Sequence, residues 1–231
     1  MARGNIFCMI AAGILASLLG SSSLNKADYR PIRQEPVKSP AVMPAYELET
    51  SDIDQDSIDL LIGTLENVPD RIQDAVNKRG GKVVLFEGDI HETEAVSRLE
   101  ELTCEKISCD AMDIDKARGV YIYAVKKAMI KQGSHDFPHV TLHEYGHMVD
   151  HLFSRLSSTH EFQNIYLDSL ILHYSSFRKN QNRRYGMRTS KEFFAECFAE
   201  FHSSAETRHE LKRDFPEAYK YFEELEGMLG V

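Results

Sequence analysis

Four histidines stand at four-residue intervals in the stretch HVTLHEYGHMVDH, residues 139–151. Of the three pairs with this spacing, only His143 and His147 have a glutamate, Glu144, directly after the first histidine. Two imidazoles one helical turn apart can bind the same zinc ion. Glu144 would then lie beside the metal and accept a proton from the attacking water. The sequence therefore predicts one Zn²⁺ per chain, with His143 and His147 as ligands and Glu144 as general base.

The helix that carries these residues is predicted to span 137–155. On a helical wheel its apolar residues form one stripe, which must face the core. His143, His147 and Asp150 form a polar face beside it, with Gly146 between the two. A glycine inside a helix costs about 1 kcal/mol relative to alanine, so we expect another backbone, most simply a strand, to pass close to Gly146. Asp150 is expected to accept the second ring N–H of a ligand histidine.

The outer histidines of the row, His139 and His151, are expected to line the cleft at the two edges of the polar face rather than to bind metal.

A catalytic zinc needs a third protein ligand and an open position. Glu192 and Glu196 lie four residues apart on a predicted helix over 190–204, whose aromatic face opposes a face of alanines and acids. The small face would let this helix approach the histidine helix closely. Thr189 and Glu192 also fit a capping box, S/T-x-x-E. The pattern alone leaves cap and ligand open for Glu192, and leaves Glu192 and Glu196 nearly equal as the third ligand.

The surrounding elements suggest an α+β fold, with a small sheet in the N-terminal half and a mostly helical C-terminal half. Residues 83–88 and two segments within 119–133, joined at a Lys-Lys turn, are predicted strands. Strand 119–124 or 128–132 would offer an edge on which an extended peptide lies antiparallel. The predicted helices are 55–65, 69–79, 92–102, 137–155, 160–176, 190–204 and 208–227.

The N-terminus is typical of an exported bacterial protein. Residues 6–20 are an apolar run that follows Arg3, and small residues follow it, so residues 1–22 are predicted to be a signal peptide. This run is short for a membrane span, although an uncleaved anchor stays open. Residues 23–46 contain four prolines and are predicted to be an extended linker, with an arm packed on the domain as the alternative. The domain is then expected to span 47–231.

Composition limits the possible partners. The formal net charge is -9, which argues against nucleic acid because its binding needs clustered cations. We expect a secreted monomer that acts on an extended peptide or protein and has no stable membrane association after signal cleavage. Cys104 and Cys109 would form a short disulfide or stay as two thiols; the spacing does not decide.

The stretches SHDFPHVTLHEYGHMVDHLF and YGMRTSKEFFAECFAEF, in this order, resemble the metalloprotease domain of anthrax lethal factor and its relatives, which include small secreted Pro-Pro endopeptidases. A weaker similarity extends upstream through GKVVLFEG and ARGVYIYA, so that the resemblance covers most of residues 55–228. It implies a zincin-like fold of the gluzincin type and a zinc-dependent endopeptidase.

Residue by residue, the resemblance implies that His143, His147 and Glu192 bind zinc and that Glu144 is the general base. It implies that Tyr185 hydrogen-bonds the substrate carbonyl and that Glu196 is an acid behind the ligands. The Pro-Pro-cleaving relatives use an aromatic wall that includes tryptophan, whereas this chain has none. Tyr121, Tyr123 or Phe137 would have to replace it.

The predicted function is therefore a secreted zinc endopeptidase, with Pro-Pro bonds among the candidate cleavage sites. Two alternatives stay open: a toxin-like protease for a single host protein, and a catalytically idle, zinc-stabilised binding module.

Overall fold

The computed structural model describes residues 45–49, 52–103, 118–177 and 186–228. All of them belong to one compact unit, Ser39–Val231. The predicted signal peptide, nearly all of the predicted linker, Tyr185 and both Cys104 and Cys109 lie outside the described residues. Within the described part of the chain, no helix is both long and apolar enough to cross a membrane.

A four-stranded sheet forms in the N-terminal half, with the order β1-β2-β4-β3. Its strands are β1 (Tyr46–Leu48), β2 (Lys82–Phe86), β3 (Gly119–Ile122) and β4 (Lys127–Lys131). β1 and β4 pair parallel to β2, and β3 pairs antiparallel to β4. The predicted strands are confirmed, and β1 is an addition that starts at the last residue of the predicted linker.

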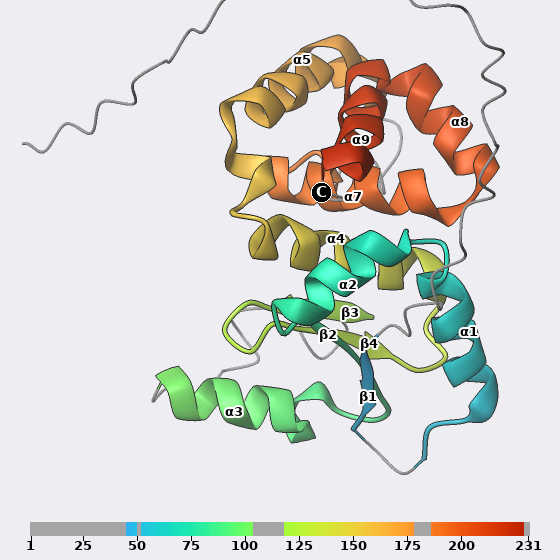
Figure 1. Ribbon diagram of the computed structural model, residues 1–231, viewed down its shortest axis with the longest axis vertical. Coiled ribbons are helices and arrows are strands. Elements are labelled where there is room, and N and C mark those ends of the chain that lie inside the picture. The colour runs from blue at the N-terminus through green and yellow to red at the C-terminus, as the bar shows by residue number, and fades with distance from the viewer. Residues whose placement is uncertain (1–44, 50–51, 104–117, 178–185, 229–231) are drawn as a thin grey trace, which may run out of the picture. The chain divides into compact units, whose positions relative to one another are not determined.

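The central strand β2 is buried on both faces. Val83 and Leu85 join the main core, whereas Val84 and Phe86 join a second, smaller core on the other face. This alternation follows from the two-residue period of a strand. Helix α3 (Glu94–Thr103) covers the smaller core, and helices α1 (Gln55–Leu65) and α2 (Asp70–Lys78) lie on the other side (Figure 1).

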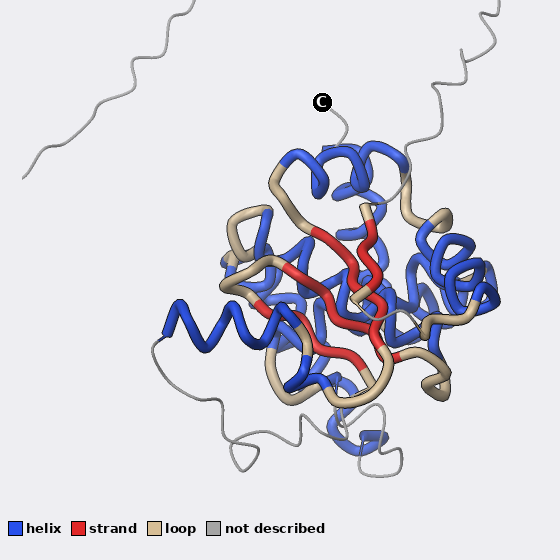
Figure 2. The backbone as a smooth tube through the Cα atoms, turned by 90° about the horizontal axis from the view of Figure 1, so that it is seen from below, coloured by secondary structure: helices blue, strands red, loops and turns tan. Residues whose placement is uncertain are grey.

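Helix α4 (Phe137–Leu152) lies against the sheet on the side of the main core (Figure 1). Figure 2, seen from below, shows helices behind the strands of the sheet. Helix α7 (Ser190–Ser203) packs on the opposite side of α4, so α4 is sandwiched and buried over most of its length. The other helices in the described part of the C-terminal half are α5 (His160–Phe177), α8 (Ala205–Asp214) and α9 (Pro216–Met228), with a short 3-10 turn at Leu156–Ser158. Another 3-10 turn, Ile90–Glu92, precedes α3 in the N-terminal half.

The single helix predicted over 208–227 is wrong, because two helices, α8 and α9, occupy this region. Pro216 has no backbone N–H and its ring blocks the preceding turn, so a continuous helix would be broken there. The start of α8 is fixed earlier than predicted by a capping box between Ser204 and Thr207.

Candidate metal centre

Helix α4 places its histidines toward α7 because its apolar residues are needed elsewhere. Leu142, Tyr145 and Val149 are buried in the main core. His143 and His147 therefore fall on the neighbouring face, and their side chains are only 10% and 9% exposed. Two imidazoles this deeply buried need polar partners.

Those partners come from the first two turns of α7. Thr189 is the N-cap, and its hydroxyl accepts a hydrogen bond from the backbone N–H of Glu192 at 3.2 Å. The carboxylate of Glu192 points to the histidines of α4 instead. The sequence left open whether Glu192 belongs to the helix cap or meets the histidines. In the structure it does both, because the cap uses the backbone N–H of Glu192 and leaves its side chain available.

The close approach of the two helices depends on Gly146. A Cβ atom at this position would lie 3.0 Å from Cα of Ala195 and 3.0 Å from Cβ of Phe198. The expectation that a strand passes near Gly146 is therefore wrong: the neighbouring backbone is helix α7. The expectation that α4 and α7 pack directly on each other is confirmed.

The first cluster consists of His143, His147 and Glu192. Oε2 of Glu192 lies 3.3 Å from Nε2 of His143 and 3.6 Å from Nε2 of His147. In a tetrahedral zinc site with ligands at about 2.0–2.1 Å, the ligand atoms are separated by about 3.4 Å. Oε2 of Glu192 is also buried without a hydrogen-bond partner among the described residues. These three side chains thus have the spacing and the unused acceptor that fit a zinc ion.

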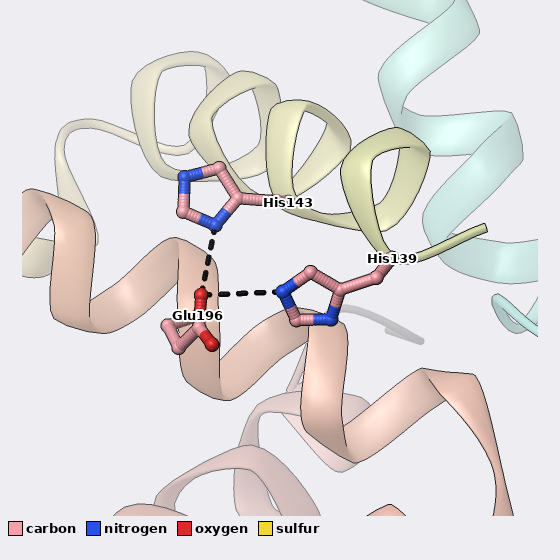
Figure 3. Close-up of side chains that lie close together, drawn as sticks. All are labelled: His139, His143 and Glu196. Atoms are coloured by element: carbon pink, nitrogen blue, oxygen red, sulfur yellow. Dashed lines mark hydrogen bonds and ion pairs between the residues drawn. The ribbon is translucent and has the colours of Figure 1, made fainter. Parts of the chain in front are cut away.

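A second cluster repeats the pattern one helical turn away (Figure 3). Oε2 of Glu196 lies 3.3 Å from Nδ1 of His143 and 3.3 Å from Nε2 of His139. Here the carboxylate oxygen does have a hydrogen-bond partner, His139. His143 belongs to both clusters and presents a different ring nitrogen to each glutamate.

Glu144 lies next to the first cluster. Burial raises the pKa of its carboxyl above the usual value, while His143 and His147 lower it and Glu192 raises it further. The charged groups with the largest effect on this pKa are thus the three members of the first cluster, beside which Glu144 lies. A carboxylate with a raised pKa beside a metal site can take up a proton from water and release it again.

The neighbouring histidines keep the glutamates of both clusters ionised. Burial alone would raise the pKa of Glu192, but the neighbouring His143 and His147 lower it to about 2. For Glu196, His139 and His143 likewise outweigh burial, and its pKa is also about 2. Both carboxylates are therefore ionised at neutral pH, the form in which a carboxylate binds metal.

Asp150 does not behave as predicted. Its two carboxylate oxygens accept hydrogen bonds from the backbone N–H and the hydroxyl of Ser157, at 2.6 and 2.8 Å. Nδ1 of His147 has no hydrogen-bond partner among the described residues. Asp150 thus fixes the turn after α4 rather than a ligand histidine, because that turn brings Ser157 back against the helix.

His151 and the candidate aromatic wall lie on the β3 side of α4. Nδ1 of His151 lies 2.9 Å from the hydroxyl of Tyr121, and its ring packs edge-on against Tyr123. Tyr121 and Phe137 are buried, whereas Tyr123 is 40% exposed. Of the three aromatic residues considered in place of tryptophan, Tyr123 is therefore the one that solvent reaches.

β3 is the strand that a peptide could extend. It lies at one end of the sheet, whereas β4 pairs with strands on both sides. Of the two strands considered, only β3 has a free edge within the described sheet. Its first residue, Gly119, approaches α4 so closely that a Cβ would lie 2.9 Å from Cγ of Glu144.

Tyr185 lies outside the described residues, but the residue after it does not. A Cβ on Gly186 would lie 3.0 Å from Cγ of Glu196, so the backbone passes directly over this glutamate. The hydroxyl of Tyr166 donates to the carbonyl of Met187 at 3.0 Å and holds the segment there. Gly186 permits this close contact because it has no side chain.

The similarities to known proteins agree with this architecture. The family model described as "Anthrax toxin lethal factor, N- and C-terminal domain" matches residues 33–225. The chain belongs to this family. A search of curated proteins found no match.

Among solved structures, the Pro-Pro endopeptidase from Paenibacillus alvei is similar, with a TM-score of 0.62 and 23% sequence identity over 78% of this chain and 96% of that chain. The likeness is one of fold. It confirms, together with the family match, the prediction of a zincin-like α+β architecture for this lethal factor family member.

Proposed function

We propose that this chain is a zinc-dependent endopeptidase in which His143, His147 and Glu192 hold the metal and Glu144 is the general base. The observation that carries the proposal is the first cluster, in which Oε2 of Glu192 lies at about the ligand–ligand distance of a zinc tetrahedron from both histidines and Glu144 stands beside them. Membership of the lethal factor family supports a metal-dependent protease.

Zinc, when bound, would acidify the attacking water and polarise the scissile carbonyl. Glu144 takes the proton of the water and delivers it to the leaving amine. A carboxyl with a pKa raised by burial suits both directions of this transfer. Tyr185 is proposed, from the family resemblance, to donate a hydrogen bond to the carbonyl oxygen as negative charge develops there.

The substrate is proposed to be an extended peptide or protein segment that pairs with the free edge of β3. Such pairing would direct the chain past Glu144, because Gly119 at the start of β3 lies against this residue. Peptides with a Pro-Pro bond are the first to test, because the similar solved structure is described as a Pro-Pro endopeptidase. Tyr123 would supply the exposed aromatic surface.

We also propose that residues 1–22 direct export and that the mature protein is a secreted monomer with an extended segment before the domain at 47–231. The support is the apolar run at residues 6–20 and the prolines that follow. N-terminal sequencing and mass measurement of the protein in culture medium test the cleavage, and sedimentation tests the monomer.

A peptide-library digest read by mass spectrometry tests the activity, with the wild-type protein, the protein treated with chelator, and Glu144→Gln. We expect cleavage only by the zinc-loaded wild type. Glu144→Gln should keep about one zinc per chain, because Glu144 is not a ligand. Retained zinc without cleavage in the wild type would favour the zinc-stabilised binding module, and loss of zinc from Glu144→Gln would remove its assignment as a base. Cleavage of one host protein but of no library peptide would favour the toxin-like protease.

A further inference from the structure

We propose that His139 is a positioning residue for the metal ligand His143 and acts through Glu196. The inference rests on the proposed zinc site and adds a residue outside it. His139 was expected only to line the cleft. Instead its ring turns toward Glu196 on α7, as does the ring of His143, and all three side chains meet at one carboxylate oxygen (Figure 3).

The arrangement follows from the spacing of both helices. Residues four apart on a helix lie one above the other, so His139 and His143 form one row on α4, and Glu192 and Glu196 form another on α7. The two rows face each other, which gives two similar clusters that share His143. Distance alone does not distinguish the two clusters, because the contacts to the glutamate oxygen are 3.3 and 3.6 Å in the first and both 3.3 Å in the second.

Hydrogen bonding distinguishes the first cluster from the second. If Nε2 of His143 binds the metal, Nδ1 must carry the proton, and its acceptor is then Oε2 of Glu196, 3.3 Å away. A carboxylate in this position fixes the tautomer and the ring orientation of a ligand histidine. Nε2 of His139 lies 3.3 Å from the same oxygen and can donate to it as well. Oε2 of Glu196 thus has two imidazole partners in this cluster without a metal.

Glu196 needs this second donor. A glutamate has several rotatable side-chain bonds, and fixing them costs conformational entropy. Gly186 restrains the aliphatic stem, because its backbone passes against Cβ and Cγ of Glu196. His139 restrains the carboxylate itself. The stem and the head of Glu196 are therefore held from two sides, and the oxygen under His143 stays in place.

His139 can be changed without opening the core. Its side chain is 40% exposed, whereas that of His143 is 10% exposed. His139→Leu removes the donor and keeps a side chain of similar bulk, and His139→Gln restores an N–H donor. His209→Leu is a matched control, because His209 is an exposed histidine of α8, remote in sequence from both clusters.

The test measures zinc in the full chain. Metal analysis gives the stoichiometry, and a competing chelator gives the dissociation constant and the rate of zinc loss. We expect one zinc per chain throughout, and in His139→Leu up to about a 10-fold weaker affinity, the low end of the effect of partners behind the ligands. His139→Gln should recover most of this loss, and His209→Leu should match the wild type.

A double-mutant cycle with Glu196→Gln decides whether the effect passes through Glu196. Coupled residues give non-additive losses, so His139→Leu should weaken zinc binding little further once Glu196 is replaced. Wild-type zinc retention in His139→Leu, or fully additive losses, would overturn the proposal. Two zinc ions per wild-type chain, with the second lost in His139→Leu, would overturn it too and make the second cluster a metal site. Failure of the proposed function looks different, because the wild type itself would then bind no zinc or cleave no peptide.

Discussion

Gly146→Ala is the substitution that most directly tests how the two ligand helices are held together. Gly146 stands between His143 and His147 on α4, and the residue it touches, Ala195, stands between Glu192 and Glu196 on α7. A methyl group here would meet carbon atoms at 3.0 Å, whereas carbon atoms pack at about 3.5–4.0 Å. The helices must therefore separate locally by a few tenths of an ångström.

The magnitude follows from two opposing effects. Replacing glycine by alanine inside a helix gains about 1 kcal/mol, and overpacking a close contact costs about 1–3 kcal/mol. The free energy of unfolding of the metal-free protein should therefore fall by about 0–2 kcal/mol. Zinc sites tolerate only about 0.2 Å in ligand distance, so binding must draw the helices back together. A cost of about 1–3 kcal/mol for this corresponds to a roughly 5- to 150-fold weaker zinc affinity.

Chelator competition measures the affinity, and urea unfolding of the metal-free protein measures the stability. Gly63→Ala is the matched control, because Gly63 is also helical but a Cβ there would meet nothing within 4 Å. It should gain up to about 1 kcal/mol and leave zinc binding unchanged. If Gly146→Ala were stabilised like Gly63→Ala and kept wild-type zinc affinity, the helix contact would not set the ligand geometry.

Three further predictions concern single residues. Glu192→Gln should reduce zinc affinity more than Glu196→Gln, which we expect to stay within the roughly 10–100-fold effect of a partner behind the ligands; the reverse order would exchange their roles. Tyr185→Phe should lower kcat by about 10- to 1,000-fold with little change in KM or zinc content, and steady-state kinetics that show a loss confined to KM would reduce it to a substrate contact. Burial, with Arg208 nearby, lowers the pKa of His202 to about 3, so the unfolded chain takes up this proton first and stability is lost as pH falls from about 6.5 toward 3. In the metal-free protein, His202→Phe should make unfolding midpoints depend less on pH between 7 and 5, and an unchanged slope would contradict the assignment.

The sequence predicted most elements because their signals are local. The apolar stripe of α4 and the aromatic face of α7 each follow from a helical period within one segment. Pro216 is also a local signal for a helix break, but the prediction of one continuous helix over 208–227 did not take it into account. β1 escaped prediction because three residues after a proline-rich stretch have no pattern of their own; they become a strand only by pairing with β2.

Local sequence patterns do not decide whether Glu192 or Glu196 is the third ligand. Both glutamates lie on the same face of α7, and both find two histidines at similar distances. Which of the two clusters becomes the metal site depends on how α7 is shifted along α4, and the Gly146–Ala195 contact sets that shift. In this register Glu144 faces Glu192, whereas Glu196 faces a second ring nitrogen and His139. A shift of α7 by one turn would place Glu196 beside Glu144 and bring Glu200, four residues further on, to the position that Glu196 holds now. The glycine contact therefore determines which glutamate lies beside Glu144 and can take the proposed ligand position, a role that no spacing within either helix could reveal.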